Sequence, residues 1–337
     1  MFNKKYNILV LGHNGMLGYD VYNYFSNLAK SRNSNINVVS GIDIDDNIDI
    51  SQESALTNYL YDKIHYDICI NCIAYTDTKA AEDYSKGYDA SYRLNALAPK
   101  YISQTCNKLK MKLIHISTDY VFSDKSDSTV SSADLTCFHR SATVFPVNNY
   151  GLHKLLGEQF IKEEFQDNRK NYCILRTSWL YGAHNNKSFI HKFINNVVSK
   201  LETDPNSEIK MTLDEFSVPT STKFLTDVIY ISIFNKLYGI HHAVPSCDSN
   251  GVSRFKFASE ILKCFSDDDI VNGVKLKNVN LTPAANDSFY PKFSAMLGIS
   301  CYDESIYAKQ WIDVLHEFMD KHKAEILNNA KTINERK

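Results

Sequence analysis

The sequence lacks an excess of charge of either sign. Its 37 lysines and arginines nearly balance 39 aspartates and glutamates, which gives a net charge of −2. Proteins that bind nucleic acid usually present a basic face, and proteins that bind membrane surfaces carry polybasic segments. The balance therefore favours a small polar ligand as partner, with no nucleic acid and no membrane.

Long apolar runs are also missing. The first apolar run, residues 8–11, ends at a glycine and is too short for the core of a signal peptide or for a membrane span. We therefore expect a soluble, cytoplasmic protein.

Cysteine is present, but without the spacing of a zinc site or a disulfide framework. The eight cysteines are scattered among apolar segments of a chain that is long enough to fold without disulfides. Cys69 and Cys72 form a Cys-x-x-Cys, yet their segment is typical of a buried strand, whereas the redox motif opens a helix. No second pair completes a zinc site, so we expect no metal.

The pattern of apolar residues predicts an α/β fold. Short apolar runs suited to buried parallel strands alternate with segments of helical periodicity, as in a Rossmann-type doubly wound parallel sheet. A chain of 337 residues is long for a single domain, so we also expect a smaller α/β substrate-binding lobe. The expected strands lie near residues 6–11, 37–42, 48–50, 68–73, 112–117 and 172–182.

Glycines follow the first strand directly. Residues 12–18 read Gly-x-x-Gly-x-x-Gly, and helical periodicity begins immediately after them. At such a strand-to-helix turn, backbone N–H groups and the positive end of the helix can hold a pyrophosphate, and the missing β-carbons let it approach closely. The turn therefore predicts dinucleotide binding. The expected contacts are Gly12, Asn14, Gly15, Met16, Leu17 and Gly18.

An acidic residue ends the second strand. Asp43 follows the glycines at about the distance where a carboxylate binds the adenosine ribose. A carboxylate there repels a 2′-phosphate and favours NADH, although basic neighbours can override it, so the cofactor is NADPH or NADH. Residues in the next loop and after the strand at 68–73 are expected to face the same cofactor. These are Asp49, Ile50, Ala74, Tyr75, Thr76 and, from a following helix, Asn95.

Tyr150 and Lys154 form the candidate catalytic pair. Positions i and i+4 of a helix lie on one face, so the ammonium is expected beside the phenol, where it stabilises the phenolate. That would turn a group with a pKa of about 10 into an acid or base near neutral pH. The spacing is common, and most such pairs are an aromatic residue beside a lysine. Thr118, at the end of the strand at 112–117, either donates its hydroxyl to a substrate or caps local backbone.

Six motifs in one order give the chain a specific resemblance. The chain resembles the extended short-chain dehydrogenase/reductase superfamily and, within it, the dTDP-4-dehydrorhamnose reductases. The motifs cover roughly residues 6 to 225 and read Gly-His-Asn-Gly-Met-Leu-Gly at 12–18, Asn-Cys-Ile-Ala-Tyr-Thr at 71–76, Ser-Thr-Asp-Tyr-Val-Phe at 117–122, Tyr-Gly-Leu-His-Lys at 150–154, Arg-Thr-Ser-Trp-Leu-Tyr-Gly at 176–182 and Pro-Thr at 219–220.

The resemblance implies an NAD(P)H-dependent reductase of a nucleotide-linked 4-keto-6-deoxy sugar, in deoxysugar or L-rhamnose-type biosynthesis. It makes Thr118, Tyr150 and Lys154 the catalytic triad, with Asn95 in support. Hydride would pass to carbon 4 of the sugar, Tyr150 would protonate the alkoxide, and Lys154 would lower the tyrosine pKa and hold the nicotinamide ribose. The expected substrate contacts are Thr118, Asp119, Tyr120, Trp179, Asn186 and Lys292.

The resemblance also implies a domain division. The dinucleotide-binding domain is expected at residues 1–182 with about 225–245, the nucleotide-sugar-binding lobe at about 183–224 and 246–325, and a polar tail at 326–337. A homodimer is compatible with the sequence.

Three departures from the family pattern leave the substrate open. The loop before Tyr150 is long and lacks the usual acidic pair, Ser217 replaces a usual glycine, and residues 290–294 read Tyr-Pro-Lys-Phe-Ser where Arg-Pro-x-Asn-Ser is usual. The nucleotide is therefore dTDP or UDP, and the sugar is a deoxy or an acetamido sugar. Two alternatives remain: a bifunctional nucleotide-sugar epimerase/4-reductase, and a non-catalytic regulatory subunit like the β subunit of methionine adenosyltransferase.

Overall fold

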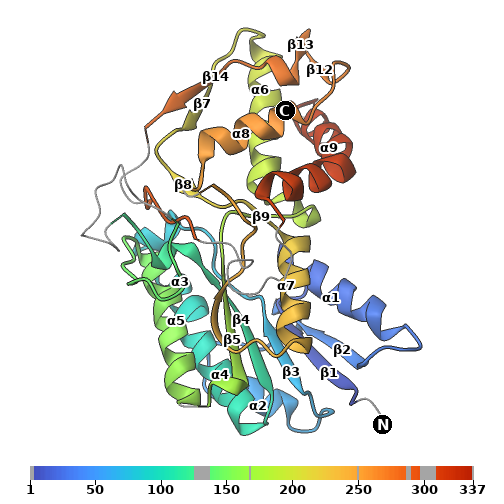
Figure 1. The fold of residues 1–337 in the computed structure, drawn as a ribbon, viewed down its shortest axis with the longest axis vertical. Helices are drawn as coiled ribbons and strands as arrows, with labels where there is room; N and C mark the ends of the chain where they lie inside the picture. Colours follow the sequence, from blue (N-terminus) through green and yellow to red (C-terminus); the bar gives the residue numbers. More distant parts are fainter. Residues whose placement is uncertain are drawn as a thin grey trace. The chain divides into compact units, whose positions relative to one another are not determined.

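The chain forms two compact units (Figure 1). The computed structural model describes residues 4–124, 137–166, 168–248, 250–285, 290–296 and 309–335. Unit 1 comprises Met1–Phe122, Val144–Thr177 and Leu225–Ala243. Unit 2 comprises Ser123–Thr143, Ser178–Phe224 and Val244–Lys337.

Unit 1 is built on a six-stranded sheet with the order β10-β5-β4-β3-β1-β2. Its strands are β1 (Tyr6–Leu11), β2 (Ile36–Ile42), β3 (Ile68–Asn71), β4 (Lys112–Thr118), β5 (Tyr172–Thr177) and β10 (Gly239–His242). All five neighbouring pairs are parallel. The chain runs outward from β1 to β2 and then returns to β3 on the other side of β1. This reversal is the topological switch point of a doubly wound sheet, so the predicted Rossmann-type α/β fold is confirmed.

Helices cover both faces of this sheet (Figure 1). On one face lie α1 (Met16–Ala29) and α7 (Thr222–Phe234), where the Tyr24 and Phe25 rings of α1 lie 6.0 and 6.5 Å from Tyr230 of α7. The opposite face carries α2 (Ala55–Leu60), α3 (Tyr88–Tyr92), α4 (Ala98–Lys108) and α5 (Asn149–Phe165). Because both faces are covered, the central strands β1 and β3 carry continuous apolar runs, residues 8–11 and 68–70, instead of an alternating pattern.

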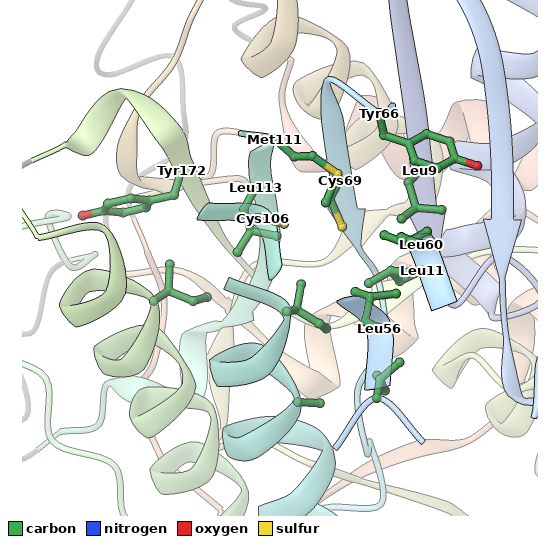
Figure 2. Close-up of a cluster of buried hydrophobic side chains, with 14 of the residues drawn as sticks. Leu9, Leu11, Leu56, Leu60, Tyr66, Cys69, Cys106, Met111, Leu113 and Tyr172 are labelled. Carbon is green, nitrogen blue, oxygen red and sulfur yellow. The ribbon is translucent and has the colours of Figure 1, made fainter. Parts of the chain in front are cut away.

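The core of unit 1 lies between the sheet and the helices α2, α4 and α5. Figure 2 shows Leu9 and Leu11 of β1, Cys69 of β3 and Leu113 of β4 pointing toward Cys106 of α4. Each of these five side chains has no exposed surface. Cys69 therefore serves as a small apolar core residue, as its apolar segment predicts. In the part of the chain that the structure describes, no three His, Cys, Asp or Glu residues gather as a metal site.

Two predicted strands are wrong. Residues 48–50 form a loop and a turn, because the Asp49 carboxylate accepts hydrogen bonds from the backbone and hydroxyl of Ser51 and so curls the chain. The strand expected at 172–182 ends at Thr177, since Trp179 has a φ of +37°, which a strand cannot accommodate. Leu180–Tyr181 (β6) pairs instead with Thr220–Ser221 (β9) within unit 2.

Unit 2 combines helices with short strand pairs. Its helices are α6 (Phe189–Thr203), α8 (Arg254–Lys263) and α9 (Trp311–Glu335). The remaining ladders are β7 (Ile209–Thr212) with β14 (Leu281–Ala284), β8 (Phe216–Ser217) with β11 (Val252–Ser253), and the hairpin of β12 (Ile270–Val271) and β13 (Val274–Lys275). Aromatic side chains pack inside this unit, with the Phe257 ring 5.7 Å from Tyr181 and 6.4 Å from Trp311.

The structure places several boundaries differently from the sequence-based division. Residues 123–143 and 178–182 group with unit 2, not with the dinucleotide-binding domain. The expected polar tail from residue 326 is the end of α9, where Ile326, Leu327 and Ala330 are buried. The polar residues of this stretch occupy the outer face of the helix, which composition alone does not distinguish from a frayed tail. Within the described ranges, no helix has the length and apolarity that a membrane crossing requires.

Candidate active site

The glycine turn joins β1 to α1 in the conformation that the sequence predicts. Gly12 has a φ of +79°, and the Gly15 N–H donates to the Gly12 carbonyl at 3.0 Å. A β-carbon on Gly18 would lie 1.9 Å from that same carbonyl oxygen, so only glycine lets α1 start so close to the turn. Within the described chain, Gly15 caps α1 without a side-chain hydrogen bond, and the first turn holds no acidic residue. A helix start without acidic residues is suited to a pyrophosphate, and contacts of Asn14, Met16 and Leu17 with a dinucleotide stay predictions.

Asp43 is fixed beside this turn. One oxygen of its carboxylate accepts from the Asn14 N–H at 2.8 Å, and the other accepts from the Ile44 N–H at 2.8 Å. The end of β2 is thus tied to the glycine turn. The contact of this carboxylate with an adenosine ribose stays a prediction.

Asp49 is held in a local network. Its carboxylate accepts from the Ser51 N–H at 3.0 Å and from the Ser51 hydroxyl at 2.6 Å, and it pairs with Arg93. These hydrogen bonds from Ser51, followed by the nearby Arg93 charge, hold the pKa of Asp49 below its usual value despite partial burial. The adjacent Ile50 is buried. Contacts of Asp49 and Ile50 with a cofactor stay predictions.

Asn95 clamps the loop that follows β3. It lies in a π-helical turn, Arg93–Leu97, between α3 and α4, and it has no exposed surface. Its side-chain oxygen accepts from the Tyr75 N–H at 3.1 Å, and its amide donates to the Tyr75 carbonyl at 3.0 Å. Asn95 therefore fixes the backbone of Tyr75 in the loop after β3, and contacts of Ala74, Tyr75 and Thr76 with a cofactor stay predictions. The sequence pointed to this residue, but neither the π-turn nor the clamp has a sequence signal.

Thr118 and Tyr150 meet at the end of β4. Tyr150 is the second residue of α5, which is capped by the Asn148 side chain accepting from the Gly151 N–H at 2.8 Å. A β-carbon on Gly151 would lie 2.3 Å from the Tyr120 carbonyl oxygen, so this glycine lets α5 start against the turn after Thr118. Thr118 also acts on the Tyr150 hydroxyl, where it opposes the rise of the tyrosine pKa. The structure thus brings the two predicted catalytic hydroxyls together.

Asp119 and Tyr120, which follow Thr118, contact the two hydroxyl residues. The Thr118 hydroxyl lies 3.1 Å from a carboxylate oxygen of Asp119, whose side chain is buried, and it accepts from the Tyr120 N–H at 3.2 Å. The Tyr120 ring meets the Tyr150 ring edge-on at 5.8 Å. Asp119 and Tyr120 therefore belong to the immediate surroundings of the hydroxyl pair, and their contact with a substrate stays a prediction.

Lys154 lies one helical turn after Tyr150 and is 1% exposed. Its ammonium donates to the Ile116 carbonyl of β4 at 2.6 Å. Burial lowers the pKa of Lys154 to about 8, although Glu158 and Cys72 act to raise it. Lys154 is thus a buried cation that loses its proton more readily than an exposed lysine.

The pKa of Tyr150 differs from the expectation. Burial raises it to about 12, partly offset by the hydrogen bond with Thr118 and reinforced by the charge of Asp119. The prediction that Lys154 lowers this pKa is wrong for this structure, because burial of the tyrosine is the largest influence and Lys154 is not among the groups that act on it. Tyr150 therefore stays protonated at neutral pH, which is the state that a proton donor needs.

The other predicted substrate residues lie in unit 2. Trp179 is 9% exposed, and the Arg254 guanidinium lies 3.5 Å from its ring centroid. Asn186 is in the left-handed region with a φ of +52°, in a short 3₁₀ segment. Lys292 is largely exposed, with its ammonium 3.8 Å from Asp214. The Arg254 contact with Trp179 has no signal in the sequence.

Comparison with known proteins identifies the family. The model of the RmlD substrate binding domain matches residues 6–324. The spore coat polysaccharide biosynthesis protein SpsK of Bacillus subtilis is 26% identical, over 76% of this chain and 81% of its own. A dTDP-4-keto-6-deoxy-D-glucose reductase of Streptomyces niveus is 28% identical, over 71% of this chain and 72% of its own.

Solved structures agree with this family. A dTDP-4-dehydrorhamnose reductase of Clostridium acetobutylicum is 28% identical with a TM-score of 0.73, covering 94% of this chain and 99% of the other. A dTDP-4-dehydrorhamnose reductase of Bacillus anthracis, solved in complex with NADP, is 26% identical with a TM-score of 0.74 at the same coverage. The chain therefore belongs to the RmlD substrate binding domain family of the extended short-chain dehydrogenase/reductases, and it has their Rossmann-type NAD(P) fold.

Proposed function

We propose that the protein is an NAD(P)H-dependent reductase of a dTDP-linked 4-keto-6-deoxy sugar. The observation that carries this proposal is the packing of the start of α5, with Tyr150, against the turn that follows Thr118 at the end of β4, with Lys154 one turn further along α5. The names of the relatives, which include dTDP-4-dehydrorhamnose reductases and a dTDP-4-keto-6-deoxy-D-glucose reductase, supply the substrate class.

The site residues of unit 1 have separate roles in cofactor binding and in proton transfer. The glycine turn and Asp43 hold the dinucleotide, and Asn95 fixes the backbone of Tyr75 beside it. The bound dinucleotide supplies the hydride. Thr118 donates a hydrogen bond to the substrate carbonyl, and the protonated Tyr150 gives its proton to the developing alkoxide. Lys154 supplies a positive charge next to this proton transfer.

Epimerisation is less well supported by the described residues. An epimerase needs a further base to remove a proton beside the carbonyl, and the candidates that the sequence offers are His13, Cys72 and Tyr75. Burial raises the pKa of the Cys72 thiol far above its usual value, so it stays protonated. The His13 ring packs against Tyr22 at 5.3 Å, as part of the glycine turn. A simple reductase therefore accounts best for this site.

The decisive experiment offers the purified protein a panel of 4-keto sugars. The dTDP- and UDP-linked forms are incubated with NADH or NADPH, and the products are identified by mass and stereochemistry. The proposal predicts oxidation of the cofactor and a product two hydrogens heavier, with the dTDP-linked sugar preferred. A product epimerised at a neighbouring carbon would favour the bifunctional enzyme. No turnover of any sugar, together with intact cofactor binding, would favour the regulatory-subunit alternative.

A further inference from the structure

Two cysteines of unit 2 lie side by side although they are far apart in the sequence. The Sγ atoms of Cys137 and Cys247 are 3.6 Å apart, across a separation of 110 residues. Cys137 is buried and Cys247 is half-buried, and neither forms a disulfide in the structure. The proposed reaction gives no role to either thiol.

The backbone beside each thiol is held in place. The N–H of Phe138, which follows Cys137, donates to the Ala295 carbonyl at 2.8 Å. The carbonyl before Cys247 accepts from the N–H of Trp311, the first residue of α9, at 2.8 Å. A disulfide requires the two sulfur atoms to approach from 3.6 Å to about 2.05 Å. Rotation of the two side chains on a fixed backbone can supply that approach.

The environment of this pair favours reaction, whereas that of a second cysteine pair opposes it. Burial raises the pKa of Cys106, which neighbours Cys69 in the core of unit 1, well above its usual value. At Cys137 the adjacent Cys247 thiol is the largest influence and lowers the pKa, with the Gly251 backbone acting in the same direction against burial. The thiolate is the form of cysteine that reacts with oxidants. Position and reactivity therefore coincide at Cys137 and Cys247.

We propose that Cys137 and Cys247 are a redox-responsive thiol pair, which closes to a reversible disulfide when the protein meets a peroxide. In proteins of reducing compartments, disulfides of this kind are usually transient. The disulfide would join the segment at residues 137–138, which pairs with residues 295–296, to the segment at residues 246–248. The pair exists whatever the protein reduces, and only an effect on a sugar would rest on the proposed function.

The chemistry consumes one peroxide and releases two waters. The Cys137 thiolate sulfur attacks one peroxide oxygen, the O–O bond breaks, and the departing hydroxide takes up the proton that the thiol had lost. This leaves a sulfenic acid on Cys137. The Cys247 sulfur then attacks the Cys137 sulfur, the S–O bond breaks, and the hydroxide leaves with the Cys247 proton as water. A small dithiol such as dithiothreitol reverses the oxidation.

The test identifies the crosslink directly in the full-length protein. The protein is reduced with dithiothreitol, desalted and treated with hydrogen peroxide, and the remaining thiols are alkylated after unfolding. Mass spectrometry of the digested, non-reduced protein should show one crosslinked pair of peptides that contains Cys137 and Cys247. The intact mass should fall by two hydrogens, and dithiothreitol should restore it.

Variants of single cysteines give the matched comparison. Cys137→Ser and Cys247→Ser should each abolish the crosslink, and if the buried Cys137→Ser does not fold, Cys247→Ser at the half-buried position still tests the pair. Cys264→Ser removes another thiol of unit 2, whose Sγ donates to the Glu260 carbonyl at 3.2 Å, a bond that a serine hydroxyl can replace. Burial raises the pKa of Cys264 to about 11, so this variant should form the crosslink as wild type does.

Hydrogen exchange reports whether the disulfide restrains its surroundings. The Phe138 amide, bonded to the Ala295 carbonyl, should exchange several-fold more slowly in the oxidised protein and regain its original rate after reduction, because the crosslink opposes local opening. The inference is overturned by a folded wild-type protein in which both thiols survive peroxide. A sulfinic acid on Cys137 beside an intact Cys247 thiol, or a crosslink to a different cysteine, would overturn it as well. A Cys137–Cys247 crosslink in a protein that reduces no sugar would support the thiol pair and reject only the proposed reaction.

Discussion

Replacement of Tyr150 by phenylalanine removes a single oxygen atom from the site. The ring keeps its edge-on contact with Tyr120, at 5.8 Å. Even a complete side-chain hydrogen bond contributes only about 1 kcal/mol to stability, so the variant should fold with nearly unchanged stability. The chemical step loses its proton donor, which costs roughly 10²–10⁴ in rate, or about 3–5 kcal/mol of barrier.

The pH dependence separates Tyr150 from Lys154. Because the pKa of Tyr150 is raised to about 12, the tyrosine stays protonated from acidic to moderately alkaline pH. Its titration therefore causes no change of rate in that pH range. The pKa of Lys154 is lowered to about 8, so its ammonium is present below pH 8 and is lost as the pH rises through that value. Wild-type activity should therefore fall above about pH 8. The Tyr150→Phe variant should be slow at every pH.

The assay is single-turnover hydride transfer to a dTDP-4-keto sugar, followed by loss of the reduced cofactor. Tyr172→Phe is the matched control, because it removes a tyrosine hydroxyl at the start of β5, the opposite end of the strand from Thr177. Cofactor affinity should change little in either variant. A folded Tyr150→Phe protein that transfers hydride as fast as wild type would refute the assignment of the proton donor.

The remaining predictions concern the cofactor. Asn95→Leu removes both hydrogen bonds to the Tyr75 backbone, so NAD(P)H binding, measured by calorimetry, should weaken about tenfold or more. Unchanged affinity would show that the loop after β3 keeps its conformation without Asn95. Asp43→Asn removes the charge expected to repel a 2′-phosphate, so the ratio of NADPH to NADH affinity should rise, and a constant ratio would reject a role for Asp43 in the choice. In Gly18→Ala, the new β-carbon would lie 1.9 Å from the Gly12 carbonyl oxygen, so the turn must shift and cofactor binding should be lost, whereas retained binding would place the dinucleotide elsewhere.

The sequence by itself determined the features that depend on neighbours along the chain. The apolar run of β1, the glycines after it and the periodicity of α1 are local patterns, because a strand buried on both faces, a close turn and a helix each constrain consecutive residues. The same holds for Tyr150 and Lys154, which share a face of α5 wherever that helix packs. The doubly wound sheet followed from the alternation of these patterns.

Only the tertiary structure decided what depends on partners distant in sequence. Burial of Tyr150 raises its pKa where helical spacing predicted a fall, and the bond from Lys154 to the Ile116 carbonyl of β4 has no signal in that spacing. The Asn95 clamp on Tyr75 crosses 20 residues, and the Arg176 contact with Glu158 joins β5 to α5. Sequence spacing shows which residues share one face of a helix. The pKa values of those residues depend on which other elements bury that face, and only the tertiary structure determines this.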